Sequence, residues 1–394
     1  MMMFAAEIAL WSSVGLIIYA YAGYPLALSV LSLWKQQGVK KADVYPPVTF
    51  IITAYNEEKR ITEKLENTLK LAYPRSSLEV FVASDCSSDR TDEIVKSYTD
   101  RGIRLVRATA RKGKEAAQKL AVEAASGEIL IFSDVATILP ENAVSNIVRN
   151  FHDPTVGCVS SVDRFLDQNG RVSGEGAYVR YEMLLRSLET KVNSLVGLSG
   201  SFFAARRSVC GEWASDLQSD FNTLLSTVRQ GLRGVSDPDT VGYYRNIMDE
   251  KKEYERKVRT VLRGIAVFMG NLHLLNPVRY GLFSWQLFSH KLCRWLVPFG
   301  LILAFLANLA LATRGQFLYQ ITLCFQAVFY AVGAVGWAVP AIGGRGVGKI
   351  IAFFLVVNIS ILHAWYRYWR GERIVNWQPS ERSSLDVRDH RVAK

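Results

Sequence analysis

The hydrophobic positions divide the chain into two apolar ends and a globular middle. The first stretch, from about residue 4 to residue 34, is long enough to cross a bilayer. Its interruption at Gly23, Tyr24 and Pro25 predicts a kink or a tilt. Three more apolar stretches follow towards the C-terminus, at about residues 296–313, 317–339 and 349–366.

The middle of the chain alternates between β-rich apolar runs and amphipathic helical patterns. Strands are predicted at 48–55, 78–85, 103–108 and 128–134, and helices between them at 57–71, 91–100 and 114–125. Strands that alternate with helices form a mostly parallel, Rossmann-like α/β sheet wrapped by helices. The ligands of such a sheet bind beyond the carboxyl ends of its strands.

The region between the globular middle and the last apolar stretches mixes basic and aromatic residues. This mixture is typical of helices that lie in the headgroup layer of a membrane. The expected organisation is an N-terminal transmembrane segment 1–34, a globular α/β domain 46–244, amphipathic interfacial helices 245–295, C-terminal membrane helices 296–366 and a basic tail 367–394.

The charge of the chain bears on its partners. The 394 residues include 47 Lys and Arg against 36 Asp and Glu, a net charge of +11. Many basic residues flank the apolar segments, so membrane lipids and phosphorylated substrates are the expected partners. Nucleic acid is not expected, because no nucleic-acid-binding fold is recognisable. The five cysteines form no CxxC pair and are odd in number, which predicts reduced thiols.

Basic residues also predict the orientation in the membrane. Lys35, Lys40 and Lys41 follow the first apolar stretch and place the globular domain in the cytosol, in a multi-pass protein of the inner (cytoplasmic) membrane. If all three C-terminal stretches crossed the membrane, the arginine-rich tail would lie outside, against the same rule. One stretch is therefore expected to be interfacial or re-entrant. Which one is left open, although Asn358 and His363 weaken the 349–366 stretch as a span.

Acidic residues end or follow the predicted strands. They are Glu57, Asp85 and Asp134, with Asp220 further along the chain. Any one of them alone is typical of a turn or a helix cap. Several carboxylates at one sheet edge favour a cation or a diphosphate–metal site, because oxygen ligands suit Mg²⁺ or Mn²⁺.

Six short motifs follow one another along the globular middle of the chain. They are ITAYNEE (52–58), SDCSSDRT (84–91), RKGKEAAQ (111–118), FSDVAT (132–137), LSGSFFAARR (198–207) and SDFNTLL (219–225). Their order is that of family 2 glycosyltransferases of the GT-A fold, which the chain resembles from about Pro46 to Arg263. Its flanking membrane segments resemble the polysaccharide-synthase branch, which contains cellulose, hyaluronan and poly-N-acetylglucosamine synthases.

The resemblance implies a binding site for a UDP-sugar. Asp85 would bind the uridine. Lys112 and Lys114 would meet the diphosphate, with Gly113 allowing close approach of the backbone. A solvated run of charge is the alternative for either lysine. The nucleobase and ribose would be held by Ala54, Tyr55, Asn56 and Glu57.

The resemblance also implies the chemistry. Asp134 would hold Mg²⁺ or Mn²⁺, which stabilises the UDP leaving group. Asp220 matches the general base that deprotonates the acceptor hydroxyl. Gly200 and Ser201 belong to the motif expected to bind the acceptor. One in-line displacement inverts the anomeric centre, so an α-linked donor would give a β-glycoside.

The chain departs from the family pattern in three places. Ala136 stands where a second metal ligand is usual, so the metal would rely on Asp134, phosphate oxygens and water, with Thr137 as a further candidate. Ser219 replaces a common acidic residue beside Asp220, which removes a like charge near the base. The Gln-x-x-Arg-Trp motif of processive synthases is missing.

Basic residues on a predicted helix take the place of that missing motif. Arg259 and Arg263 share a face by their i, i+4 spacing, and they either bind the diphosphate or belong to a membrane-surface helix. Near the end of the chain, Trp377 and Arg382 resemble a tail motif of the same branch. They either help to close the site or anchor the chain at the membrane interface.

The sequence therefore predicts an inverting transferase that moves a sugar from a UDP-sugar to a growing polysaccharide and forms a β-glycosidic bond at the cytosolic membrane face. Transfer of one sugar to a lipid carrier is the alternative, favoured by the missing motif. A third hypothesis is an inactive nucleotide-binding subunit of a synthase complex, against which the retained carboxylates argue. The donor sugar, the acceptor, any partner subunit and the oligomeric state are left open.

Overall fold

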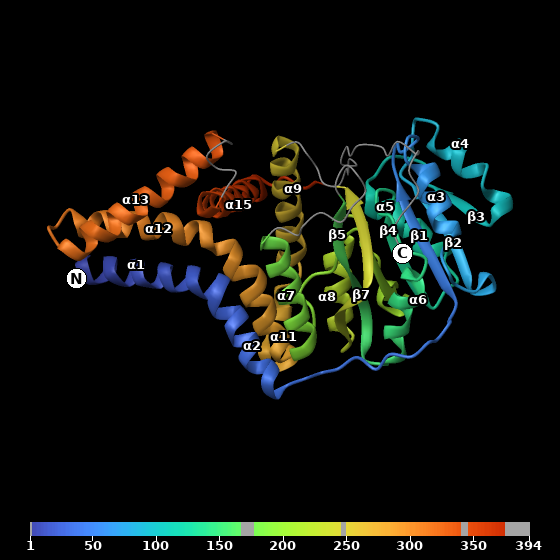
Figure 1. Cartoon of the computed structure of the whole chain (residues 1–394), viewed down its shortest axis with the longest axis horizontal. Coiled ribbons are helices and arrows are strands. Elements are labelled where there is room, and N and C mark those ends of the chain that lie inside the picture. Colours follow the sequence, from blue (N-terminus) through green and yellow to red (C-terminus); the bar gives the residue numbers. More distant parts are fainter. Residues whose placement is uncertain (1, 167–176, 246–249, 340–345, 375–394) are drawn as a thin grey trace. The chain divides into compact units, whose positions relative to one another are not determined.

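The computed structural model describes residues 2–166, 177–245, 250–339 and 346–374 (Figure 1). It divides into two compact units. The α/β unit is built on Lys35–Asp249, and the helical unit consists of Met1–Trp34 together with Glu250–Arg373.

The α/β unit contains a mostly parallel sheet of seven strands in its described residues, in the order β3-β2-β1-β4-β6-β5-β7. Strands β3, β2, β1 and β4 are parallel to one another, β6 is antiparallel to both β4 and β5, and β7 is parallel to β5. The predicted α/β fold is confirmed. The strands are β1 Val48–Ala54, β2 Leu78–Ser84, β3 Ile103–Arg107, β4 Ile129–Asp134, β5 Val156–Leu166, β6 Phe202–Arg206 and β7 Arg233–Arg245.

Helices cover both faces of the sheet (Figure 1). On one face Phe50 and Ile52 of β1 pack with residues of α3, α4 and α6, and on the other Ile51 packs with residues of α5 and α8. A central strand buried on both faces accounts for the unbroken apolar run in β1. The helices are α3 Ile61–Leu69, α4 Thr91–Lys96, α5 Lys114–Ala124, α6 Ala143–Val148, α7 Ala177–Val192 and α8 Ser219–Arg229.

The strand register brings the predicted strand-end residues to one edge of the sheet. Ala54 at the end of β1 pairs with Ser84 at the end of β2, and Thr53 pairs with Asp134 at the end of β4. The residues that follow these three strands therefore leave the sheet side by side.

The helical unit holds four helices that are long and apolar enough to cross a membrane. The expected irregularity near Gly23 is present, because a π-helical turn at Tyr19–Gly23 separates α1 from α2 and the two meet at a bend (Figure 1). The four candidate spans are Met3–Trp34, Leu282–Ala312, Phe317–Ala338 and Gly346–Trp369.

The second span begins earlier than the sequence pattern indicates. Residues 282–295, expected among the interfacial helices, are continuous with the apolar helix that follows, through a π-helical turn at Phe288–Cys293. The elements of the helical unit are α1 Met2–Ile18, α2 Tyr24–Trp34, α9 Glu250–Met269, α10 Pro277–Tyr280, α11 Leu282–Leu287, α12 Arg294–Ala312, α13 Phe317–Ala338 and α15 Gly346–Trp369.

Candidate active site

Asp85 follows β2 and is surrounded by backbone donors. Its buried carboxylate accepts hydrogen bonds from the N–H of Lys112, 2.9 Å from Oδ1, and from the N–H of Gly113, 3.0 Å from each oxygen. Gly113 has a φ of +99°, which favours glycine and lets this turn present its N–H groups to the carboxylate. Burial raises the pKa of Asp85, and the two N–H donors oppose that rise. The turn before α5 is thereby fixed to the end of β2.

Tyr55 lies beside a cation that the sequence did not single out. The Arg111 guanidinium carbon is 3.9 Å from the centre of the Tyr55 ring. The next residue, Asn56, has a φ of +50°; its N–H donates to Ser87 Oγ at 3.2 Å and its Oδ1 accepts from the Ser88 N–H at 2.8 Å. The loops that follow β1 and β2 are therefore bound to each other.

Glu57 is buried and paired with a neighbouring arginine. Arg60 donates from Nε to Oε2 and from Nη2 to Oε1, both at 2.8 Å, while the Glu57 N–H donates to Thr91 Oγ1 at 2.7 Å. Burial raises the pKa of Glu57 to about 7, and the Arg60 charge acts against that rise. Ala54, at the end of β1, accepts the Asp85 N–H at 3.0 Å. Contact of Ala54 or Glu57 with a nucleotide stays a prediction.

Lys114 lies between Asp134 and the loop before β6. Its Nζ is 2.5 Å from Asp134 Oδ1 and donates to the carbonyl oxygen of Gly200 at 3.1 Å. The Lys114 side chain is only 9% exposed, so this lysine is not part of a solvated run of charge. Lys112, by contrast, exposes its side chain.

Asp134 ends β4 and is not followed by a second acidic residue two positions further on. Ala136, two residues on, offers no ligand atom on its side chain, and Thr137 is buried with its hydroxyl donating to Ser201 O at 3.3 Å. Among the described residues, no three His, Cys, Asp or Glu side chains are grouped to hold a metal ion. A cation at the Asp134 carboxylate, which is 26% exposed, would therefore need ligands from a bound substrate or water.

Lys64 is a buried cation that the sequence analysis missed. It is fully buried on α3, and its Nζ donates to Ser133 Oγ and to Thr137 O, both at 2.7 Å. Burial lowers the pKa of Lys64 to about 7, and the charge of Asp134 opposes this. Lys64 thus joins the last residues of β4 to the turn after them. In the sequence, the position of Lys64 among apolar residues of the amphipathic 57–71 pattern could have indicated that this lysine is buried.

Asp220 lies in the first turn of α8 and is buried. Its Oδ2 accepts from Gln218 Nε2 at 3.2 Å, and a Cβ on Gly200 would lie 2.7 Å from the same oxygen. Gly200 therefore contacts both the Lys114–Asp134 pair and Asp220. Its carbonyl accepts from Lys114, which is paired with Asp134, and its Cα faces the Asp220 carboxylate.

Glu115 supplies a carboxylate at the start of α8, next to the residue that precedes Asp220. Its Oε1 accepts the N–H of Ser219 at 3.4 Å, and the side chain is buried. Ser219 removes an acidic residue from the sequence next to Asp220, but α5 brings another one to the same helix end. The sequence analysis did not identify Glu115, although an acidic residue on the buried face of α5 with Gln118 is an unusual pattern.

Asp163 on β5 anchors the loop that contains Gly200. Its Oδ1 accepts hydrogen bonds from Ser199 Oγ at 2.5 Å and from Ser201 Oγ at 3.2 Å. The carbonyl of Ser201 in turn accepts the Asp134 N–H at 3.0 Å. The predicted acceptor motif is therefore held between β4 and β5 by its own hydroxyl and carbonyl groups.

Two further groups of predicted residues lie outside the described part of the α/β unit. Arg259 and Arg263 lie on α9 in the helical unit. Burial and the charges of Arg263 and Arg256 lower the pKa of Arg259, which agrees with the predicted shared face. Their binding to a diphosphate stays a prediction. Trp377 and Arg382 lie outside the described residues.

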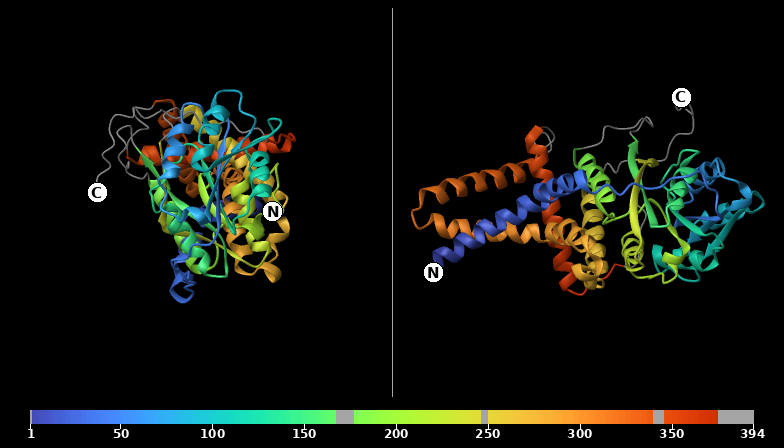
Figure 2. Two further views of the ribbon diagram at one scale, coloured as in Figure 1. Left: turned by 90° about the vertical axis from the view of Figure 1, so that its right-hand side faces the viewer. Right: turned by 90° about the horizontal axis from the view of Figure 1, so that it is seen from below.

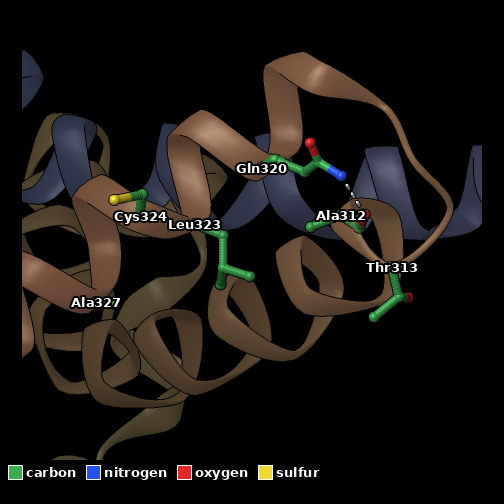
Figure 3. A pocket seen from close by; sticks show the side chains of 6 residues that line it. All are labelled: Ala312, Thr313, Gln320, Leu323, Cys324 and Ala327. Atoms are coloured by element: carbon green, nitrogen blue, oxygen red, sulfur yellow. Dashed lines mark hydrogen bonds between the residues drawn. The ribbon is translucent and has the colours of Figure 1, made fainter.

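A pocket of about 380 Å³ lies elsewhere, between α12 and α13 (Figure 3). Gln320 donates to the carbonyl of Ala312 at 3.4 Å at its edge. The lining carries no acidic or basic side chain, so this pocket offers no group for acid–base chemistry. It is lined by Ala312, Thr313, Gln320, Leu323, Cys324 and Ala327.

Comparisons with known proteins find similarity over much of the α/β unit. Residues 49–213 match the family described as Glycosyl transferase family 2. Poly-beta-1,6-N-acetyl-D-glucosamine synthase of Staphylococcus aureus (strain COL) is 27% identical over 178 residues, which cover 43% of this chain and 42% of that protein. The Staphylococcus epidermidis synthase is 24% identical over the same share of each chain. The chain thus aligns with less than half the length of these relatives.

A solved structure matches nearly the whole chain. It is a mannosyltransferase from Pyrobaculum calidifontis in complex with GDP-Man and Mn²⁺, with a TM-score of 0.74, 23% identity, and coverage of 94% of this chain and 100% of that one. The α/β unit therefore has the GT-A fold. The part of this unit that matches the family 2 glycosyltransferase model, residues 49–213, includes the strand-end carboxylates Asp85 and Asp134.

Proposed function

We propose that the chain is an inverting glycosyltransferase that moves a sugar from a UDP-sugar to a growing polysaccharide, at the cytosolic face of the inner membrane. The contact of Gly200 with both the Lys114–Asp134 pair and Asp220 carries this proposal. A donor diphosphate at the pair and an acceptor hydroxyl at Asp220 would meet within one small region of the α/β unit.

The donor would bind along the edge where β1, β2 and β4 end. Tyr55 and Arg111 form a flat cationic surface that suits a nucleobase or ribose. Asp85 holds the 111–114 segment, so that the exposed Lys112 and the buried Lys114 are available to a diphosphate. The lysines would neutralise part of the negative charge that grows on the leaving group.

The residues around Asp134 fit a divalent cation that arrives with the donor. Mg²⁺ is often held by one or two carboxylates together with substrate phosphates, and Mn²⁺ accepts the same oxygen ligands. Asp134 would be the protein ligand, and Lys114 would give up its contact with Oδ1. When bound, the ion supplies charge stabilisation for the diphosphate leaving group.

Asp220 would act as the general base. It stands in the first turn of α8, where the helix N-terminus favours a negative charge. The carboxylate would take the proton of an acceptor hydroxyl held near Gly200 and Ser201 as that oxygen attacks the anomeric carbon. A single displacement inverts that carbon, so an α-linked donor gives a β-glycosidic bond.

The acceptor class is inferred from the relatives and from the helical unit. The Staphylococcus synthases that share the domain are named for a β-linked polysaccharide. Four helices that could cross a membrane would keep the growing product at the bilayer. A lipid-linked acceptor is the second candidate, because the chain lacks the Gln-x-x-Arg-Trp motif.

The test uses the full chain purified in detergent and returned to lipid vesicles. UDP or GDP release is measured with UDP-glucose, UDP-N-acetylglucosamine, UDP-galactose and GDP-mannose, each with Mn²⁺, Mg²⁺ or EDTA. The proposal predicts metal-dependent release from one UDP-sugar and a labelled product that grows in length. A single labelled sugar on a lipid would support the second candidate, and absence of release from every donor would contradict both.

A further inference from the structure

The last apolar helix runs in a different direction from the other candidate spans. Helices α1, α12 and α13 extend side by side along one axis, whereas α15 crosses that axis (Figure 2, right). In Figure 1 the same helix is strongly foreshortened, although it has 24 residues, because it points towards the viewer. A bilayer that is crossed by α1, α12 and α13 would therefore have α15 running along its surface.

Helix α15 also packs against a highly charged helix. Tyr254 of α9 makes a hydrogen bond of 3.2 Å between its hydroxyl and Nδ1 of His363, and Lys257 Nζ lies 5.4 Å from the centre of the Phe353 ring. At 1.5 Å per residue, Phe353 and His363 lie within roughly 8 Å of the middle of α15. The middle of α15 is therefore at the same depth as this part of α9.

That part of α9 does not suit a hydrocarbon core. Glu253 pairs with Arg256 at 2.7 Å and with Lys257 at 2.9 Å, and the side chains are 27%, 41% and 23% exposed. A charged side chain is costly to place at the centre of a bilayer. Three of them at that depth oppose a crossing by α15.

The composition of α15 fits a position in the headgroup layer. Asn358 and Ser360 are buried against the protein, while Val347, Ile350 and Ile359 are exposed. Basic residues stand near both ends, and a cluster of Trp and Tyr lies in the last turns, as is typical of an interface. These residues are Lys349, Arg367, Arg370 and Arg373, and Trp365, Tyr366, Tyr368 and Trp369.

We propose that α15 is an interfacial helix that lies on the membrane with its exposed apolar side chains among the acyl chains and its basic ends at anionic headgroups. Both of its ends, with Arg370 and Arg373 just after it, are then on the side of the membrane where α12 begins. The proposal identifies α15 as the C-terminal stretch that does not cross the membrane, which the sequence left open. It also removes the conflict between three C-terminal crossings and a basic tail. The turn between α12 and α13 lies on the opposite side.

The test is labelling of single cysteines by a membrane-impermeant maleimide in the full chain. The five native cysteines are replaced by alanine, and Lys349→Cys, Arg370→Cys and Arg314→Cys are made one at a time. All three positions are exposed, with Arg314 in the turn after α12 as the matched control. Labelling is compared in intact cells and in inside-out vesicles, after washing with carbonate.

The proposal predicts that positions 349 and 370 are labelled from the inner side and position 314 from the outer side. Labelling of 349 and 370 from opposite sides would overturn it, as would labelling of both from the side of 314. Because the proposal rests on the membrane location in the proposed function, release of the protein by carbonate would overturn it separately from any result on transfer. If the cysteine-free chain does not fold, protease digestion of a C-terminal tag on the native chain shows on which side of the membrane the chain leaves α15. Digestion from the outer side would overturn the proposal.

Discussion

The Lys114 ammonium lies 2.5 Å from Asp134 Oδ1 and donates to the carbonyl of Gly200, whose Cα faces the Asp220 carboxylate. One lysine therefore connects the residue expected at the leaving group with the loop beside the expected base. Substitutions at and around these residues test this connection.

Replacing Lys114 by methionine keeps the length of the side chain and removes its charge. We expect the turnover rate to fall by roughly 100-fold, in the range seen when one electrostatic stabiliser of a transition state is removed. Lys119→Met, on the exposed side of the same helix, is the control and should leave the rate unchanged. Initial rates at saturating donor measure the effect, and equal rates for both variants would show that Lys114 has no part in transfer.

Adding one methyl group at Gly200 should disturb the base directly. In Gly200→Ala the new Cβ would lie 2.7 Å from Asp220 Oδ2, closer than real Cβ contacts allow, so the carboxylate must turn away. We expect a loss of activity of roughly 100-fold, because a general base contributes about that much or more. Gly211→Ala is the matched control, since its new Cβ has no neighbour closer than 3.6 Å. Circular dichroism checks that both variants fold.

The buried Lys64 should matter for positioning rather than for contact with substrate. In Lys64→Met the turn after β4 loses its hydrogen bonds at Ser133 Oγ and Thr137 O. We expect the turnover rate to fall by roughly 10-fold, corresponding to about 1.4 kcal/mol of lost transition-state stabilisation. Lys96→Met, on an exposed surface of α4, serves as the control. A drop in both variants would instead indicate a general effect of lost charge.

Asp153 should contribute to stability in a pH-dependent way. Burial alone would raise its pKa, but hydrogen bonds from Thr155, from the Lys40 N–H and from Arg233 hold it at about 2, below the ordinary 3.8. A lowered pKa stabilises the folded state above pH 3.8, and this contribution is lost as the pH falls towards 2. Asp153→Asn should therefore cost about 2 kcal/mol at pH 7.

Thermal unfolding of the purified chain measures that cost. The melting temperature of Asp153→Asn should be lower than that of the native chain at pH 7, and the difference should shrink as the pH falls below 4. Asp239→Asn, an exposed carboxylate, should show a smaller change at pH 7. A difference for Asp153→Asn that stays constant down to pH 3 would contradict the assigned pKa.

The sequence predicted the sheet edge well, for a physical reason. Apolar runs such as 48–55 identify buried strands, and a polar residue that ends such a run must leave the sheet at its carboxyl edge. Asp85 and Asp134 were therefore found from their positions alone. The helix expected at 57–71 begins only at Ile61, because Glu57 and Arg60 are held in the preceding turn by their mutual ion pair.

The partners of these residues could not be predicted in the same way. Lys64 with Thr137, Lys114 with Asp134 and Glu115 with Ser219 are pairs from distant parts of the chain. Their contacts depend on which helix covers which face, and spacing along one element does not encode that. The direction of α15 was open for the same reason, since its composition alone permits a span.

The most direct measurement compares the native chain with Asp220→Asn in lipid vesicles, using the UDP-sugar that the donor panel identifies. The variant keeps the size of the side chain and loses the base, so sugar transfer should fall by about 100-fold or more while UDP binding stays the same. Transfer by Asp220→Asn at the native rate would contradict the assignment of Asp220 as the base, and with it the account of this site.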